Sequence, residues 1–331
     1  MVRRIVYLCV AVSLARASFA QFEGSITVSR MLLELRVTNY DGEPITTLTP
    51  DDFEVEVAGT PVRVASVVWN AEGAGATDAQ TGDAPAEKRT VVVFIQTDFT
   101  RQPQRVTGQR SFTPYAEQII RSFAADDRIA VFSFDSHLKF RSDLTTDRDA
   151  VAAAMRRAIL IDKPSQPPAV DEPSLARFLD QESMKNARNT EEGLLIVANA
   201  LKQIDGPKTL LLVGWGMGEH LRGIVDVKPA WHAARRALVD GRVTVIALNT
   251  GIGNQLSHGL RVAAEQTGGF YAHVKQLPQV IVKRVQRTLR GRYDLELIAT
   301  RTLPAGMHPV SVRVKQRGAV VLAPQSIVIS N

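Results

Sequence analysis

Three polar residues that could bind a ligand, Gln96, Asp98 and Thr100, follow an apolar run at spacings of two residues. The six residues before Gln96 are β-prone and show no alternation of apolar and polar types. This pattern predicts a strand buried on both faces in the middle of a parallel sheet. Open α/β sheets place their binding sites at the carboxyl ends of such strands. The sequence therefore predicts a site at residues 96–100.

Two other segments supply candidates for the same site. Thr190 stands at the predicted start of a helix, where its hydroxyl is expected to cap the helix or, alternatively, to join the site. Trp215 and Met217 lie in a glycine-rich segment, residues 214–218, which lacks the Lys-Ser/Thr pair of a phosphate loop. If exposed, these two side chains would form an apolar anchor for a partner. The alternative buries Trp215 under the proline-rich segment 162–173.

The distribution of catalytic residue types argues against an enzyme. The six histidines are scattered, and neither His-Glu-x-x-His nor Gly-x-Ser-x-Gly occurs. The single cysteine, Cys9, lies in a predicted leader, so the mature chain is expected to have no thiol and no disulfide. We therefore expect a non-catalytic protein. An exported enzyme with an unrecognised site, which would need a deep pocket of ionisable groups, and a structural envelope protein are the alternatives.

Residues 1–20 have the pattern of a signal peptide. Arg3 and Arg4 precede an apolar core, and Ser18 and Ala20 place small residues at −3 and −1 from the predicted cleavage point. The apolar core is too short to span a bilayer. The protein is therefore predicted to be exported to the periplasm or the extracellular space, with no membrane span in the mature chain.

The charge of the chain is modest. The formal net charge of +6 falls to +3 when the three arginines of residues 1–20 are removed. Basic residues between 283 and 292 alternate with apolar ones, as on the solvated face of an amphipathic helix. A nucleic-acid surface would need a larger charge excess and interleaved aromatic residues. We therefore expect no nucleic-acid partner.

Changes in pattern divide the rest of the chain into four segments. Residues 22–70 and 291–331 contain short alternating strands, whereas residues 71–87 lack large apolar side chains and are predicted to be a flexible linker. Residues 88–290 alternate strands and helices, which predicts an α/β fold with a Rossmann-like, doubly wound, mostly parallel sheet. Neither β segment has enough strands for a stable core of its own. We therefore predict one β-sandwich formed by both end segments, with the α/β domain inserted between them.

A series of short motifs resembles the bacterial VWFA-related family of exported proteins, best known from acidobacteria. The matching motifs keep the same order over the whole mature chain, at residues 37–45, 48–53, 127–134, 144–147, 264–269 and 293–295. The resemblance implies a von Willebrand factor A-type domain on a β module, with a role in adhesion or protein binding.

The resemblance also implies where a metal-ion-dependent adhesion site would lie. The family places Asp-x-Ser-x-Ser in the first loop, a threonine in the second and an aspartate in the third. This sequence has Gln96 and Trp215 at the two aspartate positions, and magnesium prefers carboxylate oxygens. We therefore expect a degenerate site without a cofactor, apart from weak magnesium binding at Asp98, and a protein partner of unknown identity. The predicted binding rim comprises Gln96, Asp98, Thr100, Thr190, Trp215 and Met217.

Overall fold

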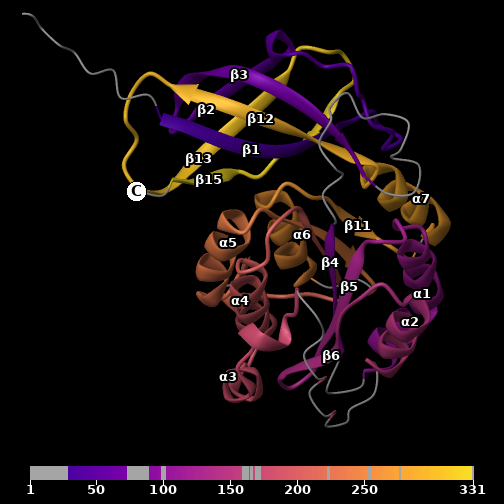
Figure 1. Ribbon diagram of the computed structural model, residues 1–331. Helices are drawn as coiled ribbons and strands as arrows, with labels where there is room; N and C mark the ends of the chain where they lie inside the picture. Colours follow the sequence, from indigo (N-terminus) through magenta and orange to yellow (C-terminus); the bar gives the residue numbers. More distant parts are fainter. Residues whose placement is uncertain are drawn as a thin grey trace, which may run out of the picture.

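The computed structural model describes residues 29–72, 89–97, 102–158, 164, 167, 173–221, 224–251, 255–275 and 277–329. An α/β part and an antiparallel sheet made from both ends of the chain lie one above the other (Figure 1). The predicted leader, residues 73–87 of the predicted linker, Lys88, Asp98 and Thr100 lie outside the described residues. Within the described ranges, no helix combines the length and apolar character needed to cross a membrane.

The α/β part is built on a six-stranded sheet in the order β11-β10-β7-β4-β5-β6. Its strands are parallel except for the edge strand β6, which runs antiparallel to β5. All seven residues of β4 are buried, as the apolar run predicts. The predicted Rossmann-like α/β sheet is thereby confirmed. The strands are β4 (Thr90–Gln96), β5 (Arg128–Phe134), β6 (Leu138–Thr145), β7 (Lys208–Gly214), β10 (Val243–Asn249) and β11 (Tyr271–His273).

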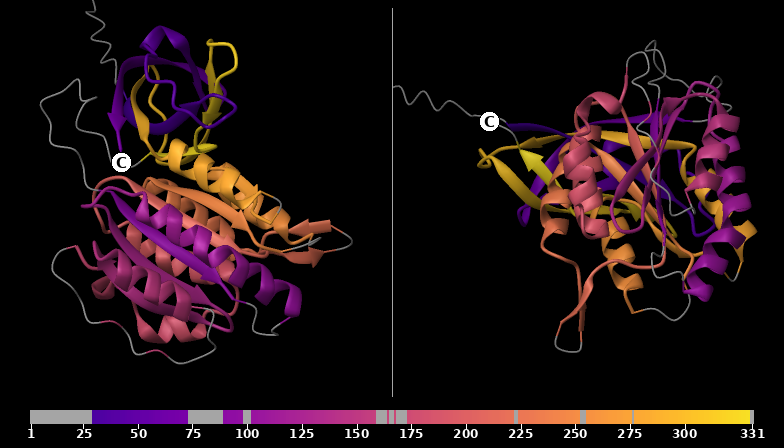
Figure 2. Two further views of the ribbon diagram at one scale, coloured as in Figure 1. Left: turned by 90° about the vertical axis from the view of Figure 1, so that its right-hand side faces the viewer. Right: turned by 90° about the horizontal axis from the view of Figure 1, so that it is seen from below.

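Helices cover both faces of this sheet (Figure 2). Alternate residues of β4 point into two separate cores, Phe94 into one and Val93 into the other. The Val93 core is closed by α1 (Pro103–Arg121), α2 (Arg148–Arg157) and α7 (Pro278–Thr288). The Phe94 core is closed by α3 (Gln181–Asn186), α4 (Thr190–Leu201), α5 (Ala230–Asp240) and α6 (Ser257–Gln266).

Helix α1 begins earlier than its sequence signal indicates. Thr113-Pro114 is typical of a helix start, because proline is tolerated in the first turn. In the structure Pro103 occupies that place, and Pro114 lies inside the helix. The Thr113 hydroxyl donates a hydrogen bond of 3.0 Å to the Gln109 carbonyl one turn earlier. The buried face formed by Phe112, Ile119 and their neighbours outweighs the missing N–H of Pro114.

The two ends of the chain form one seven-stranded antiparallel sheet in the order β14-β1-β12-β3-β2-β13-β15. Strand β12 lies between β1 and β3, so the last segment is inserted into the first. A core that includes Leu33, Phe53, Tyr293 and Leu295 packs against this sheet. The strands are β1 (Ser29–Thr38), β2 (Phe53–Val57), β3 (Thr60–Ala71), β12 (Gly291–Ala299), β13 (Gly306–Val314), β14 (Val320–Leu322) and β15 (Ser326–Ile329), with a 3₁₀ turn at Pro50–Asp52.

The predicted β-sandwich is not confirmed in that form. Hydrogen bonds join all seven strands in one continuous sheet. Tyr293 anchors a loop to this sheet, because its hydroxyl accepts from the Leu48 N–H at 3.1 Å and donates to the Ile45 carbonyl at 2.8 Å. Neither end segment has to be stable alone, because the strands of the first and last segments pair with one another.

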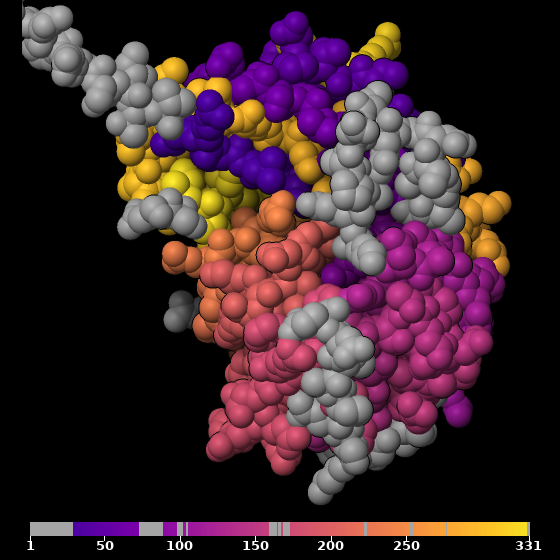
Figure 3. Space-filling model, viewed as in Figure 1, coloured from indigo at the N-terminus to yellow at the C-terminus, as the bar shows by residue number. Residues whose placement is uncertain are grey.

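A buried ion cluster joins the terminal sheet to the α/β part. Glu72, directly after β3, accepts hydrogen bonds from Arg36 and Arg89 at 3.2 Å and from Arg292 at 2.6 Å. Arg89 precedes β4 and also binds Asp127 at 2.5 Å. None of these five side chains is more than 6% exposed. The cluster therefore connects β1, β3 and β12 with the beginning of the central sheet. Figure 3 shows the outer surface along which these two parts of the molecule meet.

The charges in this cluster support one another. Burial raises the pKa of Glu72, but Arg36, Arg89 and Arg292 outweigh burial and lower it from 4.5 to about 2. Burial likewise lowers the pKa of Arg292, yet the nearby carboxylates raise it above its ordinary value. Glu72 is therefore ionised at neutral pH although almost no water reaches it.

Two sequence predictions are wrong at this joint. The linker was expected to begin at Ala71, but Ala71 ends β3 and Glu72 is buried in the ion cluster. Arg292 was expected on a solvated helix face, but it lies in β12 and is 4% exposed. The small neighbours of Glu72, Ala71 and Gly73, give no local signal of its burial, and the arginines that bind it are distant in the sequence. The solvated helix is α7 itself, where Arg287 pairs with Glu43 at 2.8 Å.

Candidate functional site

The candidate site lies where the winding of the central sheet changes direction. From β4 the chain proceeds to β5 and β6 on one side, whereas β7, β10 and β11 follow on the other. Ligand sites of open α/β sheets occur at the carboxyl ends of the strands beside such a switch point. Gln96 ends β4, residues 215–218 follow β7, and Thr190 opens α4. The structure therefore brings these three sequence-predicted segments together.

The side-chain amide of Gln96 joins the three segments. Its nitrogen donates to the Thr190 hydroxyl at 3.0 Å and to the Gly216 carbonyl. Its oxygen accepts from the backbone N–H of Trp215 at 2.9 Å and of Gly216 at 3.1 Å. Gln96 is 5% exposed, and both donor and both acceptor positions of its amide are used. The amide is thus a buried crosslink between the carboxyl ends of β4 and β7 and the start of α4.

Gly214 makes room for this crosslink. A Cβ atom at position 214 would lie 2.6 Å from the Gln96 amide oxygen. Gly218 is needed for a different reason, since its φ of +104° is one that side chains rarely adopt. The two glycines therefore have different roles, close approach at Gly214 and backbone geometry at Gly218.

Thr190 does not cap its helix, which corrects the favoured interpretation. The cap is Asn189, whose side-chain oxygen accepts from the Glu192 N–H at 2.9 Å. Thr190 is the first helical residue, 4% exposed, and its hydroxyl accepts from Gln96 instead. Because Asn189 already satisfies the helix end, the threonine hydroxyl is available to the site.

Trp215 and Met217 differ in burial, so they do not form one anchor. Met217 is 3% exposed, packs in the Phe94 core, and donates its N–H to the Leu256 carbonyl at 3.0 Å. The exposure on which the predicted two-residue anchor depends is therefore not met at Met217. Trp215 is half-buried, and the guanidinium of Arg105 lies 3.6 Å from the centre of its ring. Residues 159–163, 165–166 and 168–172 of the proline-rich region lie outside the described part, so its predicted cover over Trp215 remains untested.

A cavity of about 250 Å³ opens at this rim. Gln96, Thr190 and Trp215 line it together with charged side chains of both signs, Arg105, Asp135, Arg188, Glu191 and Lys228. Burial raises the pKa of Asp135, but hydrogen bonds from Lys139 and Ser136 outweigh burial and lower it. Sequence reasoning missed Arg105, because nothing local to α1 indicates that its side chain reaches the loop after β7.

The described residues do not reproduce a metal site. Asp98 and Thr100 lie outside them, and within them no three histidine, cysteine, aspartate or glutamate side chains gather to hold an ion. The amide oxygen of Gln96 already accepts two backbone N–H groups, and Trp215 offers no oxygen in place of an aspartate side chain. The side-chain oxygens of the described residues at this junction therefore do not fit an octahedral, oxygen-ligated cation.

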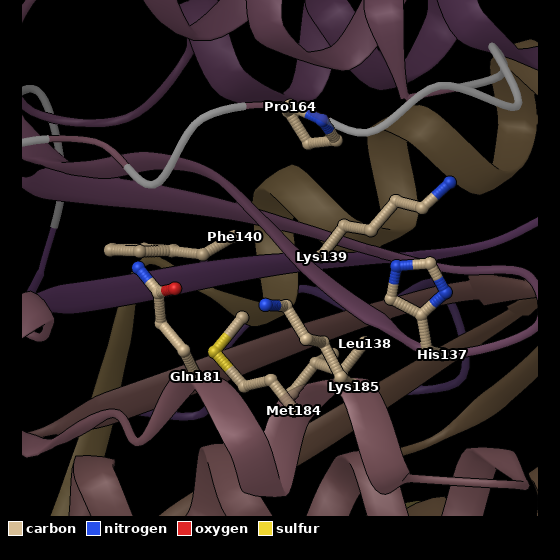
Figure 4. A pocket seen from close by; sticks show the side chains of 8 residues that line it. All are labelled: His137, Leu138, Lys139, Phe140, Pro164, Gln181, Met184 and Lys185. Atoms are coloured by element: carbon tan, nitrogen blue, oxygen red, sulfur yellow. The ribbon is translucent and has the colours of Figure 1, made fainter.

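A larger cavity, of about 440 Å³, lies between β6 and α3 and contains none of the predicted site residues (Figure 4). Its apolar wall consists of buried core side chains, Leu138, Phe140 and Met184. Lys139 is paired with Asp135 at 2.5 Å, and Lys185 is exposed. The described lining contains no carboxylate and no hydroxyl that could act with these lysines as an acid–base pair.

No protein-family model matches the chain, and no curated protein is significantly similar to it. Among solved structures, a von Willebrand factor type A protein from Catenulispora acidiphila is 9% identical with a TM-score of 0.44, over 91% of this chain and 73% of that chain. Proximal thread matrix protein 1 from the mussel byssus is 15% identical with a TM-score of 0.42, over 61% of this chain. The match covers 48% of the mussel protein, about half its length.

A third match is the vWF domain of the type V pili tip protein Mfa5 from Porphyromonas gingivalis. It is 12% identical with a TM-score of 0.37, over 60% of this chain and 94% of that chain. Both the Catenulispora protein and the Mfa5 domain are described as von Willebrand factor domains. At these identities and TM-scores the matches define neither a ligand nor an activity.

Proposed function

We propose that this protein is an exported, non-catalytic protein-binding module of adhesion type, whose binding rim is held together without a metal ion. The observation that supports this most is the Gln96 amide, which makes four hydrogen bonds to the loop after β7 and the start of α4. The resemblance implies a cation at this junction. In this chain an uncharged side chain performs the joining role, so the rim stays ordered when divalent ions are removed.

The surface next to the crosslink has the properties of a contact site. Trp215 is half-buried and stacked on Arg105, and these two residue types dominate the energetics of many interfaces. The cavity beside them, about 250 Å³, is smaller than most small-molecule sites. A shallow rim with an aromatic–arginine pair suits the side chains of another protein better than a buried substrate.

The terminal sheet leaves this rim accessible. Its contacts are made at the amino ends of the central strands, where Arg36 donates to Thr244 at 3.2 Å and Glu34 pairs with Arg242 at 2.7 Å. The rim is at the carboxyl ends of the same strands. We infer that the terminal sheet supports the α/β part from the amino ends of the central strands. The rim then faces away from the terminal sheet.

The proposal is tested by capturing partners from the source envelope on the immobilised mature protein, in magnesium and in excess chelator. The same partner should be recovered in both conditions. Trp215→Ala should abolish capture without lowering the melting temperature, whereas Tyr40→Ala, which removes an 82%-exposed aromatic far from the rim, should capture normally. Capture that requires magnesium, or that survives Trp215→Ala, would contradict the proposed function.

A further inference from the structure

A separate two-stranded hairpin follows the Gln96-bound loop. Strands β8 (Glu219–Leu221) and β9 (Ile224–Asp226) pair only with each other among the strands of the described chain. The hairpin projects beyond the central sheet, as both views of Figure 2 show. It begins directly after Gly218, so it is attached to the same rim as Trp215. A hairpin of this size has too little buried surface to be stable alone.

The register of the hairpin gives one of its faces a defined chemistry. Leu221 lies opposite Ile224, and these side chains are 46% and 67% exposed. Glu219 lies opposite Asp226 on the same face, because side chains two residues apart point to one side of a strand. Like charges directly opposite each other destabilise a strand pair. This face therefore carries an exposed apolar pair, Leu221 and Ile224, and two carboxylates, Glu219 and Asp226. The other residues of β8 and β9 include no lysine or arginine.

We propose that the β8–β9 hairpin binds an extended segment of the partner protein, which adds as a third strand at the outer edge of β8 and presents apolar and basic side chains two residues apart, on the face shared with Leu221 and Glu219. The inference rests on the proposed function and names the partner's chemistry. Edge addition supplies main-chain hydrogen bonds, and side-chain pairing supplies specificity. The outer edge of β8 is favoured because β9 lies beside α6.

The charge pattern selects this occupant over a second copy of the hairpin. Two copies paired through this face would bring four carboxylates together, from Glu219 and Asp226 of each. A segment with lysine or arginine two residues from valine or isoleucine places both side chains on one face, where they would instead neutralise the carboxylates and cover Leu221 and Ile224. The partner is therefore a basic, β-prone segment of another protein.

The test uses two synthetic eight-residue peptides titrated into the mature protein. The valine–lysine peptide repeats valine, threonine, lysine and threonine, so that valine and lysine share one face of the strand, and the valine–glutamate peptide has glutamate in place of lysine. Wild type should bind the valine–lysine peptide at least tenfold more tightly. Leu221→Ser/Ile224→Ser should weaken this binding about tenfold with an unchanged melting temperature. Glu219→Lys/Asp226→Lys should reverse the preference between the peptides.

The outcomes separate this inference from the proposed function. No binding of the valine–lysine peptide by wild type, or equal binding of both peptides, would overturn the hairpin as a binding element. Loss of peptide binding in Trp215→Ala together with normal binding in the hairpin variants would also overturn it, while leaving the rim as the binding surface. Concentration-dependent dimers that disappear in Leu221→Ser/Ile224→Ser would assign the face to a second copy instead.

Discussion

Glu72→Gln is expected to lower the free energy of unfolding by about 3 to 5 kcal/mol, because it leaves buried arginines without their shared carboxylate. Arg36, Arg89 and Arg292 all bind Glu72, and Arg36 has no other carboxylate within 4 Å among the described residues. The loss should appear in urea unfolding at pH 7 as a lower midpoint. It should affect both parts of the molecule, because the cluster joins them.

The pH dependence of stability gives a second readout of the same change. The pKa of Glu72 in the folded protein, about 2, is below its ordinary value. Its contribution is therefore fully present above about pH 5 and is lost as the pH falls toward about 2. The difference in stability between wild type and Glu72→Gln should narrow over that range.

Glu43→Gln is the matched control for Glu72→Gln. Glu43 also pairs with two arginines, Arg287 at 2.8 Å and Arg290 at 2.9 Å, but its side chain is 37% exposed. Solvent screening limits such pairs, so we expect a loss below about 1 kcal/mol. Equal losses in the two variants, or a Glu72→Gln difference that does not change with pH, would contradict the role assigned to the buried cluster.

Gln96→Ala is expected to lower the free energy of unfolding by about 2 to 4 kcal/mol and to loosen the rim. The substitution removes four hydrogen bonds at a site that is 5% exposed, and each such bond contributes about 0.5 to 1.5 kcal/mol. Backbone hydrogen exchange should accelerate at Trp215 and Gly216, whose N–H groups lose their acceptor. Urea unfolding and hydrogen exchange together measure the effect.

A second buried glutamine provides the control for Gln96→Ala. Gln109 is 4% exposed, and its amide donates one long hydrogen bond, 3.4 Å, to Thr97. Gln109→Ala should cost about 1 kcal/mol and leave exchange at Trp215 unchanged. If the two variants lose equal stability, or if exchange at Gly216 is normal in Gln96→Ala, the amide does not hold the rim.

The central sheet could be predicted because its signals are local. The unbroken apolar run before Gln96 specifies a strand buried on both faces, and the chain order places its end beside the segment after β7. The proximity of Gln96, Thr190 and Trp215 follows from that topology together with the resemblance. The pairing of the two end segments was predictable for a similar reason, since neither has enough strands to be stable alone.

The chemistry of the junction could not be predicted, because it depends on contacts between distant residues. Nothing local distinguishes a glutamine that replaces one metal ligand from one whose amide crosslinks three segments, as Gln96 does. The burial of Met217 follows from the close approach of Gly259, whose added Cβ would lie 2.6 Å from the Met217 Cγ. Glu72 likewise looks like part of a linker in the sequence, and only the folded structure shows its ion pairs with three arginines.

The most direct test of a rim held by Gln96 rather than by a cation is the melting temperature of the mature protein in millimolar magnesium and in excess chelator. A bound cation at a hundredfold excess over its dissociation constant would add about 2.7 kcal/mol, or several degrees. We expect the two melting temperatures to agree within about one degree, because the amide that occupies the junction needs no ion. A rise of several degrees in magnesium that is lost in Asp98→Ala would contradict this account and show that the site is rebuilt around Asp98.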